Sequence, residues 1–334
     1  MISAFFNRRR FLSRTCIAAA STLAAPRVLA QPAPAPWPAR PVRIIAAGPA
    51  GGSADIIARL LADQLAKEFG QAVYAEPKPG AGGVLAVTDL TQAPHDGHTL
   101  LVGVNSLVSE VPHIVKSRLD MARELKPVAE LARSGLVLVA TPAFPANNLA
   151  ELVAYTKAHP GQVNYASYTA GTVSHVLGLQ LNKAAGIDMM HVGYKGSTPA
   201  LTDLMGGHIP LMFDGMATSL PLIKAGKIKA LAVSTPKRST LLPEVATFRE
   251  LGYPQLEATA WMGLWVQPDV PAPVQQRLRE TVLKVLAQPA VRDRLQDIGF
   301  EPAQPRDPQE LAASLRADYE RMGAVLKSID FKPE

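Results

Sequence analysis

The segment that decides the fold reads VRIIAAGPAGGSADIIARLLADQLAKEFGQAVYA, residues 42–75. It contains an apolar stretch at Val42–Ala46, a glycine-rich turn, and then apolar residues that recur at helical spacing up to Gly70. A second short apolar stretch follows at Ala72–Ala75. A strand, a turn, an amphipathic helix and another strand at this spacing predict a βαβ unit of a parallel sheet.

The same alternation continues along the chain and divides it into two lobes. Further strands are expected at 100–104, 136–140, 163–166, 189–192, 209–213, 230–234 and 258–266. Helices are expected between them and over 273–286, 289–298 and 308–327. The pattern predicts an α/β fold with two doubly wound lobes joined by crossover strands. We expect lobe 1 to comprise residues 42–140 and 266–334, and lobe 2 to comprise residues 141–265 with the crossover strands.

Residues 1–30 form a leader of different composition. They hold five arginines, no acidic residue and an apolar run, and the small side chains of Val28–Ala30 fit a cleavage site. These features predict an export signal that is cleaved near Ala30. The run Arg8-Arg9-x-Phe11-Leu12 is typical of a twin-arginine signal, with an arginine-rich Sec signal as the alternative. A proline-rich lead-in follows at 31–41.

The formal net charge of +6 comes mostly from this leader, because basic and acidic residues nearly balance without it. The folded part therefore lacks the excess of Lys and Arg that a nucleic-acid partner would require. The only cysteine, Cys16, also lies in the leader, which excludes disulfides and thiolate chemistry from the mature chain. No segment has the ~20 consecutive apolar residues of a membrane span. We therefore expect an exported, soluble protein that is neither a channel nor a permease.

A glycine-rich loop that joins a strand to a helix is the first candidate binding site. It spans Gly48–Asp55, and its candidate ligand-binding residues are Gly48, Ala50, Gly51, Gly52, Ser53 and Asp55. Free N–H groups and the positive end of the helix dipole make such a turn an anion site. The loop matches neither a Walker loop nor the Gly-x-Gly-x-x-Gly fingerprint, so no nucleotide cofactor is expected. The alternative interpretation is a tight turn without a ligand.

A second loop repeats this arrangement in the other lobe. Its candidate ligand-binding residues are Thr169, Ala170, Gly171, Thr172 and, on the helix that follows, His175. Both loops follow strands at their carboxyl ends, where open α/β sheets bind ligands. Tyr194 is a further candidate for direct contact, and Asp214 for accepting a hydrogen bond from a ligand hydroxyl or amine. Helix capping, and a turn position for Asp214, are the structural alternatives.

No catalytic set accompanies these loops. The chain has no Gly-x-Ser-x-Gly elbow, and His95 and His98 straddle a turn without the helical spacing of a zinc hydrolase. The other histidines are scattered along the sequence. We therefore expect no enzyme activity, no metal and no cofactor.

Together these motifs resemble the solute-binding receptors of tripartite tricarboxylate transporters, also called Bug receptors. The resemblance covers nearly the whole mature chain. Each matching sequence motif is weak evidence alone, but the set of motifs in this order is specific for the family. It rests on the runs GGSADIIAR at 51–59, KPGAGG at 78–83, PHDGHTLL at 94–101, GTVSH at 171–175, HVGYKG at 191–196, residues 200–207 and AGKIKALAV at 225–233.

The resemblance implies a periplasmic binding protein of type II-like architecture that closes on a small carboxylated solute. Receptors of this family hold the carboxylate with backbone amides, hydroxyls, helix N-termini and water, without an obligatory arginine. The contacts carried over fall at Gly48–Asp55, Asn105 and Ser106 in the first lobe, and at Thr169–Thr172, His175, Tyr194 and Asp214 in the second. The resemblance also implies a location in the periplasm and a partnership with membrane transporter subunits. We expect the receptor itself to be a monomer.

Two positions depart from the family pattern. Gly48-Pro49-Ala50 replaces an aromatic residue followed by two prolines, and Val192-Gly193-Tyr194 replaces Val-Pro-Tyr. These changes leave the ligand open among dicarboxylates, aromatic carboxylates, amino acids and neutral amides. The leading interpretation is a non-enzymatic receptor for a small organic anion. The alternatives are an exported hydrolase or isomerase that uses the same cleft, and an orphan receptor or sensor without a transporter.

Overall fold

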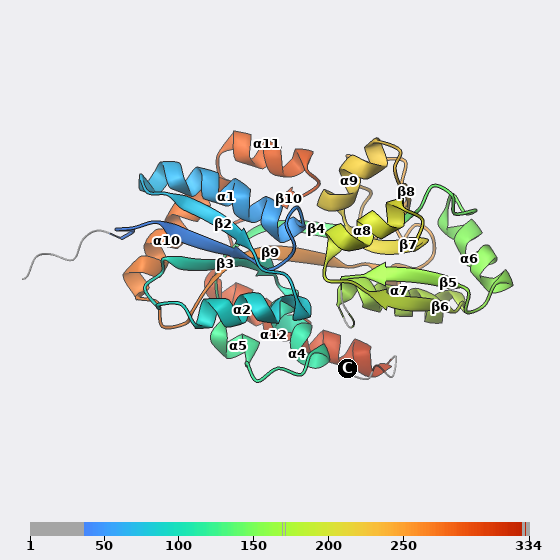
Figure 1. Cartoon of the computed structure of the whole chain (residues 1–334), viewed down its shortest axis with the longest axis horizontal. Coiled ribbons are helices and arrows are strands. Elements are labelled where there is room, and N and C mark those ends of the chain that lie inside the picture. Colours follow the sequence, from blue (N-terminus) through green and yellow to red (C-terminus); the bar gives the residue numbers. More distant parts are fainter. Residues whose placement is uncertain (1–36, 169, 171, 329–330, 332–334) are drawn as a thin grey trace, which may run out of the picture. The chain divides into compact units, whose positions relative to one another are not determined.

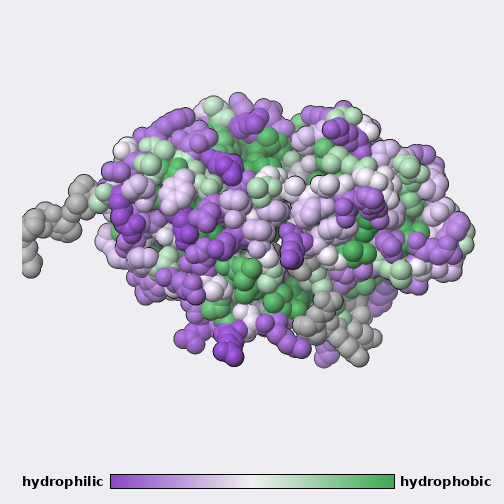
Figure 2. All heavy atoms as spheres, viewed as in Figure 1, coloured by the Kyte–Doolittle hydropathy of each residue, from purple (hydrophilic) through white to green (hydrophobic). Residues whose placement is uncertain are grey.

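The computed structural model describes residues 37–168, 170, 172–328 and 331, and those from Pro38 onward belong to one compact unit (Figure 1). The predicted export signal, residues 31–36 of the lead-in, and the candidates Thr169 and Gly171 lie outside the described residues. Within the described part, no helix is long and apolar enough to cross a membrane. Figure 2 shows hydrophilic side chains over most of one face, with small apolar areas between them.

One ten-stranded sheet runs through this unit and is organised in two halves. In the first half, β2, β1 and β3 are parallel and β9 is antiparallel to β3, with bounds Val73–Pro77, Val42–Ala46, Thr99–Val104 and Thr259–Val266. In the second half, β6, β5 and β7 are parallel, with bounds Met189–Gly193, Val163–Ser167 and Leu211–Gly215. Two short strands, β8 and β10, pair with β4, and their bounds are Lys229–Val233 and Glu301–Pro302.

Strand β4, Lys126–Ala140, joins the two halves of the sheet. Its residues 126–135 pair with β9, and its residues 136–140 pair with β7 and β8. The sequence predicted only the second part as a strand, because charged residues interrupt the apolar pattern of the first part. Glu130 is buried there and makes ion pairs with Arg133 and Arg306, at 2.5 and 3.2 Å. These partners compensate the buried charge and let it stand in a central strand.

Helices cover both faces of each half of the sheet, as Figure 1 shows. Over the first half lie α1, α2, α10, α11 and α12, with bounds Ser53–Phe69, Val84–Thr91, Ala272–Leu286, Pro289–Asp297 and Pro308–Ser328. Over the second half lie α6, α7, α8 and α9, with bounds Leu149–Ala158, Val173–Ala185, Ser197–Met205 and Met216–Lys224. The short elements are α3, α4, α5, η1 and η2, at Ser106–Ser109, Val111–Ile114, Met121–Glu124, Ala81–Gly83 and Pro254–Leu256.

The predicted fold class, an α/β protein with two doubly wound lobes joined by crossover strands, is thereby confirmed. The strands and helices of each half of the sheet form their own apolar core. In the first half, Trp265 of β9 is fully buried and stacks on Trp261 with ring centroids 5.3 Å apart. In lobe 2, the ring of Tyr165 on β5 packs so closely on α7 that a Cβ at Gly178 would come within 2.2 Å of it. Side-chain burial on both faces of each half-sheet keeps the strand ends in fixed positions.

Candidate functional site

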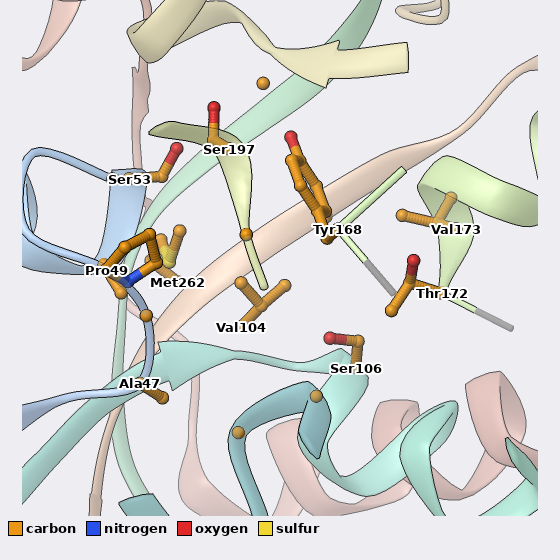
Figure 3. A pocket seen from close by; sticks show the side chains of 18 of the residues that line it. Ala47, Pro49, Ser53, Val104, Ser106, Tyr168, Thr172, Val173, Ser197 and Met262 are labelled. Atoms are coloured by element: carbon orange, nitrogen blue, oxygen red, sulfur yellow. The ribbon is translucent and has the colours of Figure 1, made fainter. Parts of the chain in front are cut away.

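A cavity of about 1130 Å³, its open mouth included, lies at the strand ends of both lobes (Figure 3). In each half of the sheet the chain adds later strands on both sides of one strand: β2 and β3 flank β1, and β6 and β7 flank β5. Open α/β sheets bind ligands at the point where the strand order switches sides in this way. Gly48 and Ser106 follow β1 and β3, Tyr168 follows β5, and Gly215 ends β7; all four line the cavity. The cavity therefore takes its walls from both lobes.

The lobe 1 wall is built on the turn between β1 and α1. Gly48, Gly52 and Ser53 line the cavity, so the N-terminus of α1 opens onto it. N–H groups in the first turn of a helix have no acceptor within the helix, which makes this end suited to an anion. The predicted residues Ala50 and Gly51 are exposed beside this turn and do not line the cavity.

Asp55 shapes this turn from behind and does not line the cavity. Its Oδ2 accepts hydrogen bonds from the Gly51 N–H and from Nε of Arg59, both at 2.9 Å. Gly51 has a φ of +72°, in the left-handed region that favours glycine. The buried carboxylate therefore holds the backbone in the shape that presents the N-terminus of α1.

The lobe 2 wall contributes three more helix N-termini. Thr172 and Val173 stand at the start of α7, Ser197 begins α8, and Gly215 directly precedes α9; all four line the cavity. Tyr194, which the sequence named as a candidate, also lines the cavity, and so do Tyr168 and Lys195. The wall thus combines helix N-termini with hydroxyl groups.

Hydroxyl groups mark two ends of the cavity (Figure 3). Ser53, Tyr168 and Ser197 lie at one end, which we call the Ser53 end. A Cβ on Gly215 would lie 3.2 Å from both the Ser53 and the Tyr168 hydroxyl oxygens, so these groups surround one spot. Ser106 and Thr172 lie at the other end, which we call the Ser106 end. Apolar side chains, among them Val104 and Met262, line the space between the two ends.

Asp214 is fully buried behind the Ser53 end and does not line the cavity. Its Oδ1 accepts a hydrogen bond from Ser197 Oγ at 2.6 Å, and its Oδ2 accepts bonds from Thr218 and Ser219, each at 2.6 Å. Tyr168 is a fourth hydroxyl donor. Burial raises the pKa of Asp214, and the four hydroxyl groups counteract that rise. In this structure Asp214 holds two cavity hydroxyls, those of Ser197 and Tyr168, in place.

Several other predicted site residues lie outside the cavity wall. Ala170 is half-buried and does not line the cavity. Asn105 is buried and joins two elements, since its Oδ1 accepts from the Trp261 N–H at 3.1 Å and its Nδ2 donates to Asp318 at 3.3 Å. His175 is buried with its ring stacked on that of His191, 3.6 Å between centroids, and burial lowers its pKa to about 3.

The sequence reasoning missed three groups of cavity residues. The turn at 80–83 lines the cavity, although its glycine run had served only to support the family resemblance. Trp261 and Met262 reach the cavity from β9, and nothing in an apolar strand pattern shows which face meets a ligand. Glu110 also lines the cavity, and no sequence motif marked it. Burial raises its pKa to about 7.

The two walls contact each other directly in this structure. The Thr198 hydroxyl donates to the Ala50 carbonyl at 3.0 Å, and the Glu110 carboxylate accepts from the Val173 N–H at 2.8 Å. A Cβ at Gly196, whose φ is +109°, would come within 2.6 Å of Pro49. The lobes are therefore closed on each other around the cavity, and glycine at 196 is what allows the close approach.

The charge of the cavity is small and divided. Among its described lining residues, Lys195 is the only basic one and Glu110 the only acidic one. No histidine is among these residues, and no serine there has a histidine as its hydrogen-bond partner. Over the described part of the chain, no group of three or more His, Cys, Asp or Glu side chains is arranged to hold a metal ion.

Comparison with known proteins identifies the relatives of the chain. The model of the tripartite tricarboxylate transporter family receptor matches residues 57–331. Protein BugT of Bordetella pertussis is 37% identical over 235 residues, which cover 68% of this chain and 71% of BugT.

Two solved structures share the fold over most of the chain. The periplasmic binding protein BugD has a TM-score of 0.84 at 30% identity, covering 89% of this chain and all of BugD. An R. palustris protein solved with adipate has a TM-score of 0.85 at 29% identity, again covering 89% of this chain and the whole of that protein. The predicted resemblance to the Bug receptors is thereby confirmed.

Proposed function

The chain belongs to the tripartite tricarboxylate transporter receptor family, and we propose that it captures a small carboxylated solute between its two lobes for uptake by a membrane transporter. One observation supports this most directly: helix N-termini from both lobes open onto a single cavity. A carboxylate that accepts hydrogen bonds from both lobes at once binds the closed form better than the open form. The related protein solved with adipate shows that this fold can hold a carboxylic acid.

We propose the Ser53 end as the main carboxylate position. Ser53, Ser197 and Tyr168 offer hydroxyl donors there, and the helices that begin at Ser53 and Ser197 add N–H groups. Lys195 adds positive potential at the cavity wall. Hydroxyls and amides of this kind replace the water that a carboxylate loses when it enters the cavity.

The lobes are proposed to move as units. Lobe 1 would comprise residues 42–140 and 266–334, and lobe 2 residues 141–265, with the crossover strands carrying the hinge. The wall contacts between Thr198 and Ala50 and between Glu110 and Val173 would break when the lobes open. Such rigid-body closure around a ligand is the usual movement of two-lobed binding proteins.

We also propose that the chain is exported to the periplasm by a signal cleaved near Ala30, of twin-arginine type, and acts there as a monomer. The location follows from its membership of a family that includes the periplasmic binding protein BugD. A non-enzymatic role fits a cavity whose described lining residues contain no nucleophile–base pair.

Mass spectrometry of the small molecules released when freshly purified protein is denatured tests this proposal. We expect an organic acid at close to one equivalent per chain. Thermal unfolding with the same acid then checks affinity, since a ligand at ~100 times its Kd adds about 2.7 kcal/mol to the unfolding free energy. The fully amidated or esterified analogue should stabilise less. If neutral compounds raise the melting temperature and a broad panel of organic acids does not, the carboxylate assignment is wrong.

A further inference from the structure

We propose that Glu110 determines which carboxylates the receptor accepts, an inference that rests on the proposed function. It selects ligands that carry one carboxylate for the Ser53 end and present a hydrogen-bond donor to the Ser106 end. Ligands with carboxylates at both ends are disfavoured. The donor can be a hydroxyl, an amide or an ammonium group.

The position of Glu110 between the lobes is the first observation. It lies between α3 and α4 in lobe 1, the residue is 6% exposed, and it lines the cavity. Its Oε2 accepts a hydrogen bond at 2.8 Å from the backbone N–H of Val173, which begins α7 in lobe 2. The protein's own carboxylate therefore occupies the N-terminus of α7, where an anion is most favoured.

This occupation changes what the second predicted anion loop can do. The loop that leads into α7 resembles an anion site in the sequence, yet in the closed structure its N-terminus is already paired with Glu110. A ligand carboxylate that reached the Ser106 end would meet a second carboxylate there. Two like charges in a buried site repel strongly, whereas a donor group on the ligand would bind to the carboxylate. Among the described residues, no hydrogen-bond donor reaches the other oxygen, Oε1, so it can accept from a ligand.

The groups around Glu110 do not cancel its charge. On α12, Asp318 and Arg321 form an ion pair with each other at 2.8 Å, and their effects on Glu110 are opposed. On α7 the nearest titratable side chain is His175, and burial lowers its pKa to about 3, so it is neutral at physiological pH. Lys195 lines the cavity but forms no ion pair with Glu110. Glu110 is thus the charge that a ligand meets at this end.

The pH dependence follows from the burial of this carboxylate. Burial raises the pKa of Glu110 to about 7, Asp318 adds to the rise, and the Val173 N–H and Arg321 oppose it. A dicarboxylate can bind without charge repulsion once Glu110 is protonated and donates a hydrogen bond. With a pKa near 7, the protonated fraction rises about tenfold between pH 8 and pH 6. Dicarboxylate affinity should rise by up to the same factor, while a monoamide, which can both donate and accept, should change little.

Calorimetry with matched ligand pairs tests the proposal on the intact mature chain. The pairs are succinate and succinamate, glutarate and glutaramate, and adipate and adipamate, each at pH 8 and pH 6. At pH 8 we expect the monoamide of the best-fitting length to bind about 10-fold more tightly than its dicarboxylate, and the gap should close at pH 6. Glu110→Gln should bring the dicarboxylate to the affinity of the monoamide at pH 8 and abolish its pH dependence. Glu320→Gln, which removes an equal charge from the exposed face of α12, should leave the ranking unchanged.

The outcomes separate this inference from the proposed function. If the wild-type protein binds the dicarboxylates at pH 8 as tightly as the monoamides, Glu110 does not select ligands, while the receptor function stands because carboxylates bind. If none of the six ligands binds, the inference is also wrong. In that case, a carboxylate recovered from the purified protein would still support the receptor function. If no carboxylate is recovered either, both the inference and the proposed function are wrong. If Glu110→Gln does not fold, the wild-type affinities at pH 8 and pH 6 decide alone.

Discussion

Replacing Asp214 by asparagine should lower both the stability of the protein and its affinity for a carboxylate. The wild-type side chain is fully buried and accepts hydrogen bonds from Ser197, Thr218 and Ser219 at 2.6 Å each, and from Tyr168. An amide has one acceptor oxygen, and its nitrogen can only donate. The hydroxyls that face the nitrogen must therefore turn round or lose their partner.

The size of the effect follows from the number of bonds lost. A hydrogen bond to a charged group contributes about 1.5–3 kcal/mol, and removing the buried charge returns part of its desolvation cost. Thr218 keeps an alternative acceptor, the Gly215 carbonyl at 3.0 Å, so about two bonds are at stake. We expect the free energy of unfolding to fall by about 3 kcal/mol, which corresponds to roughly 5 °C in Tm for a chain of this size. Because Ser197 and Tyr168 line the cavity, the Kd should rise about tenfold or more.

Guanidinium denaturation and calorimetry measure the two quantities separately, and Ser219→Ala is the matched control. Ser219 donates to the same carboxylate but does not line the cavity, so its loss should reduce stability by about 1 kcal/mol and leave affinity unchanged. If Asp214→Asn is destabilised yet binds within twofold of wild type, then the hydroxyls that Asp214 orients do not hold the ligand. If the free energy of unfolding is unchanged, the desolvation cost of the buried carboxylate is as large as the stabilisation from its hydrogen bonds.

Three further expectations test other parts of the site. Ser53→Pro should weaken carboxylate binding at least tenfold in calorimetry, because proline is tolerated at the first position of a helix but removes an N–H and a hydroxyl from the cavity wall. Ser53→Ala removes only the hydroxyl and should weaken binding less, so the difference between the two variants measures the N–H; wild-type affinity in the proline variant would move the site elsewhere. Ligand should change the tryptophan fluorescence through Trp261, which lines the cavity, and a full signal in Trp261→Phe would contradict this. Burial lowers the pKa values of His175 and His191 to about 3 and about 4, below the value near 6.5 in the unfolded chain. The free energy of unfolding should therefore be highest above pH 6.5 and fall as the pH drops. At pH 5 the loss should be about 2 kcal/mol for His175 and less for half-buried His191. Urea denaturation in the Glu110→Gln background measures this without the opposite effect of Glu110 protonation, and a flat profile from pH 7 to 5 would refute it.

The fold was largely predictable because its elements are local. The segment at 42–75 carries a strand, a turn and a helix whose limits are set by glycines, and the structure places them at Val42–Ala46 and Ser53–Phe69. The first part of β4 was not predictable in the same way. Glu130 and Arg133 break its apolar pattern, and only the tertiary structure supplies the partners that allow a buried charge.

The candidate site was predictable where a residue stands at a strand end or at a helix start. Gly48, Gly52, Ser53 and Thr172 line the cavity because strand ends and helix N-termini meet there, and the loop pattern shows this. Asp214 lies in a predicted position but behind the wall, and the sequence could not distinguish the two arrangements.

Glu110 shows why long-range contacts escape a sequence pattern. Its partner, the Val173 N–H, is 63 positions away and in the other lobe, and a single glutamate between two short helices has no periodicity to mark it. The same distance makes its contact specific to the closed form, because it joins the lobes. Other contacts also join the lobes: Val176 of α7 packs in an apolar cluster with Ile114 and Leu326 of lobe 1, and Lys183 Nζ donates to the Ser328 carbonyl at 3.1 Å. The Glu110 bond differs from these contacts because Glu110 and Val173 both line the cavity, where a ligand can meet them. A ligand that bonds to both lobes stabilises the closed form, whereas a ligand that repels Glu110 weakens a contact that only the closed form makes.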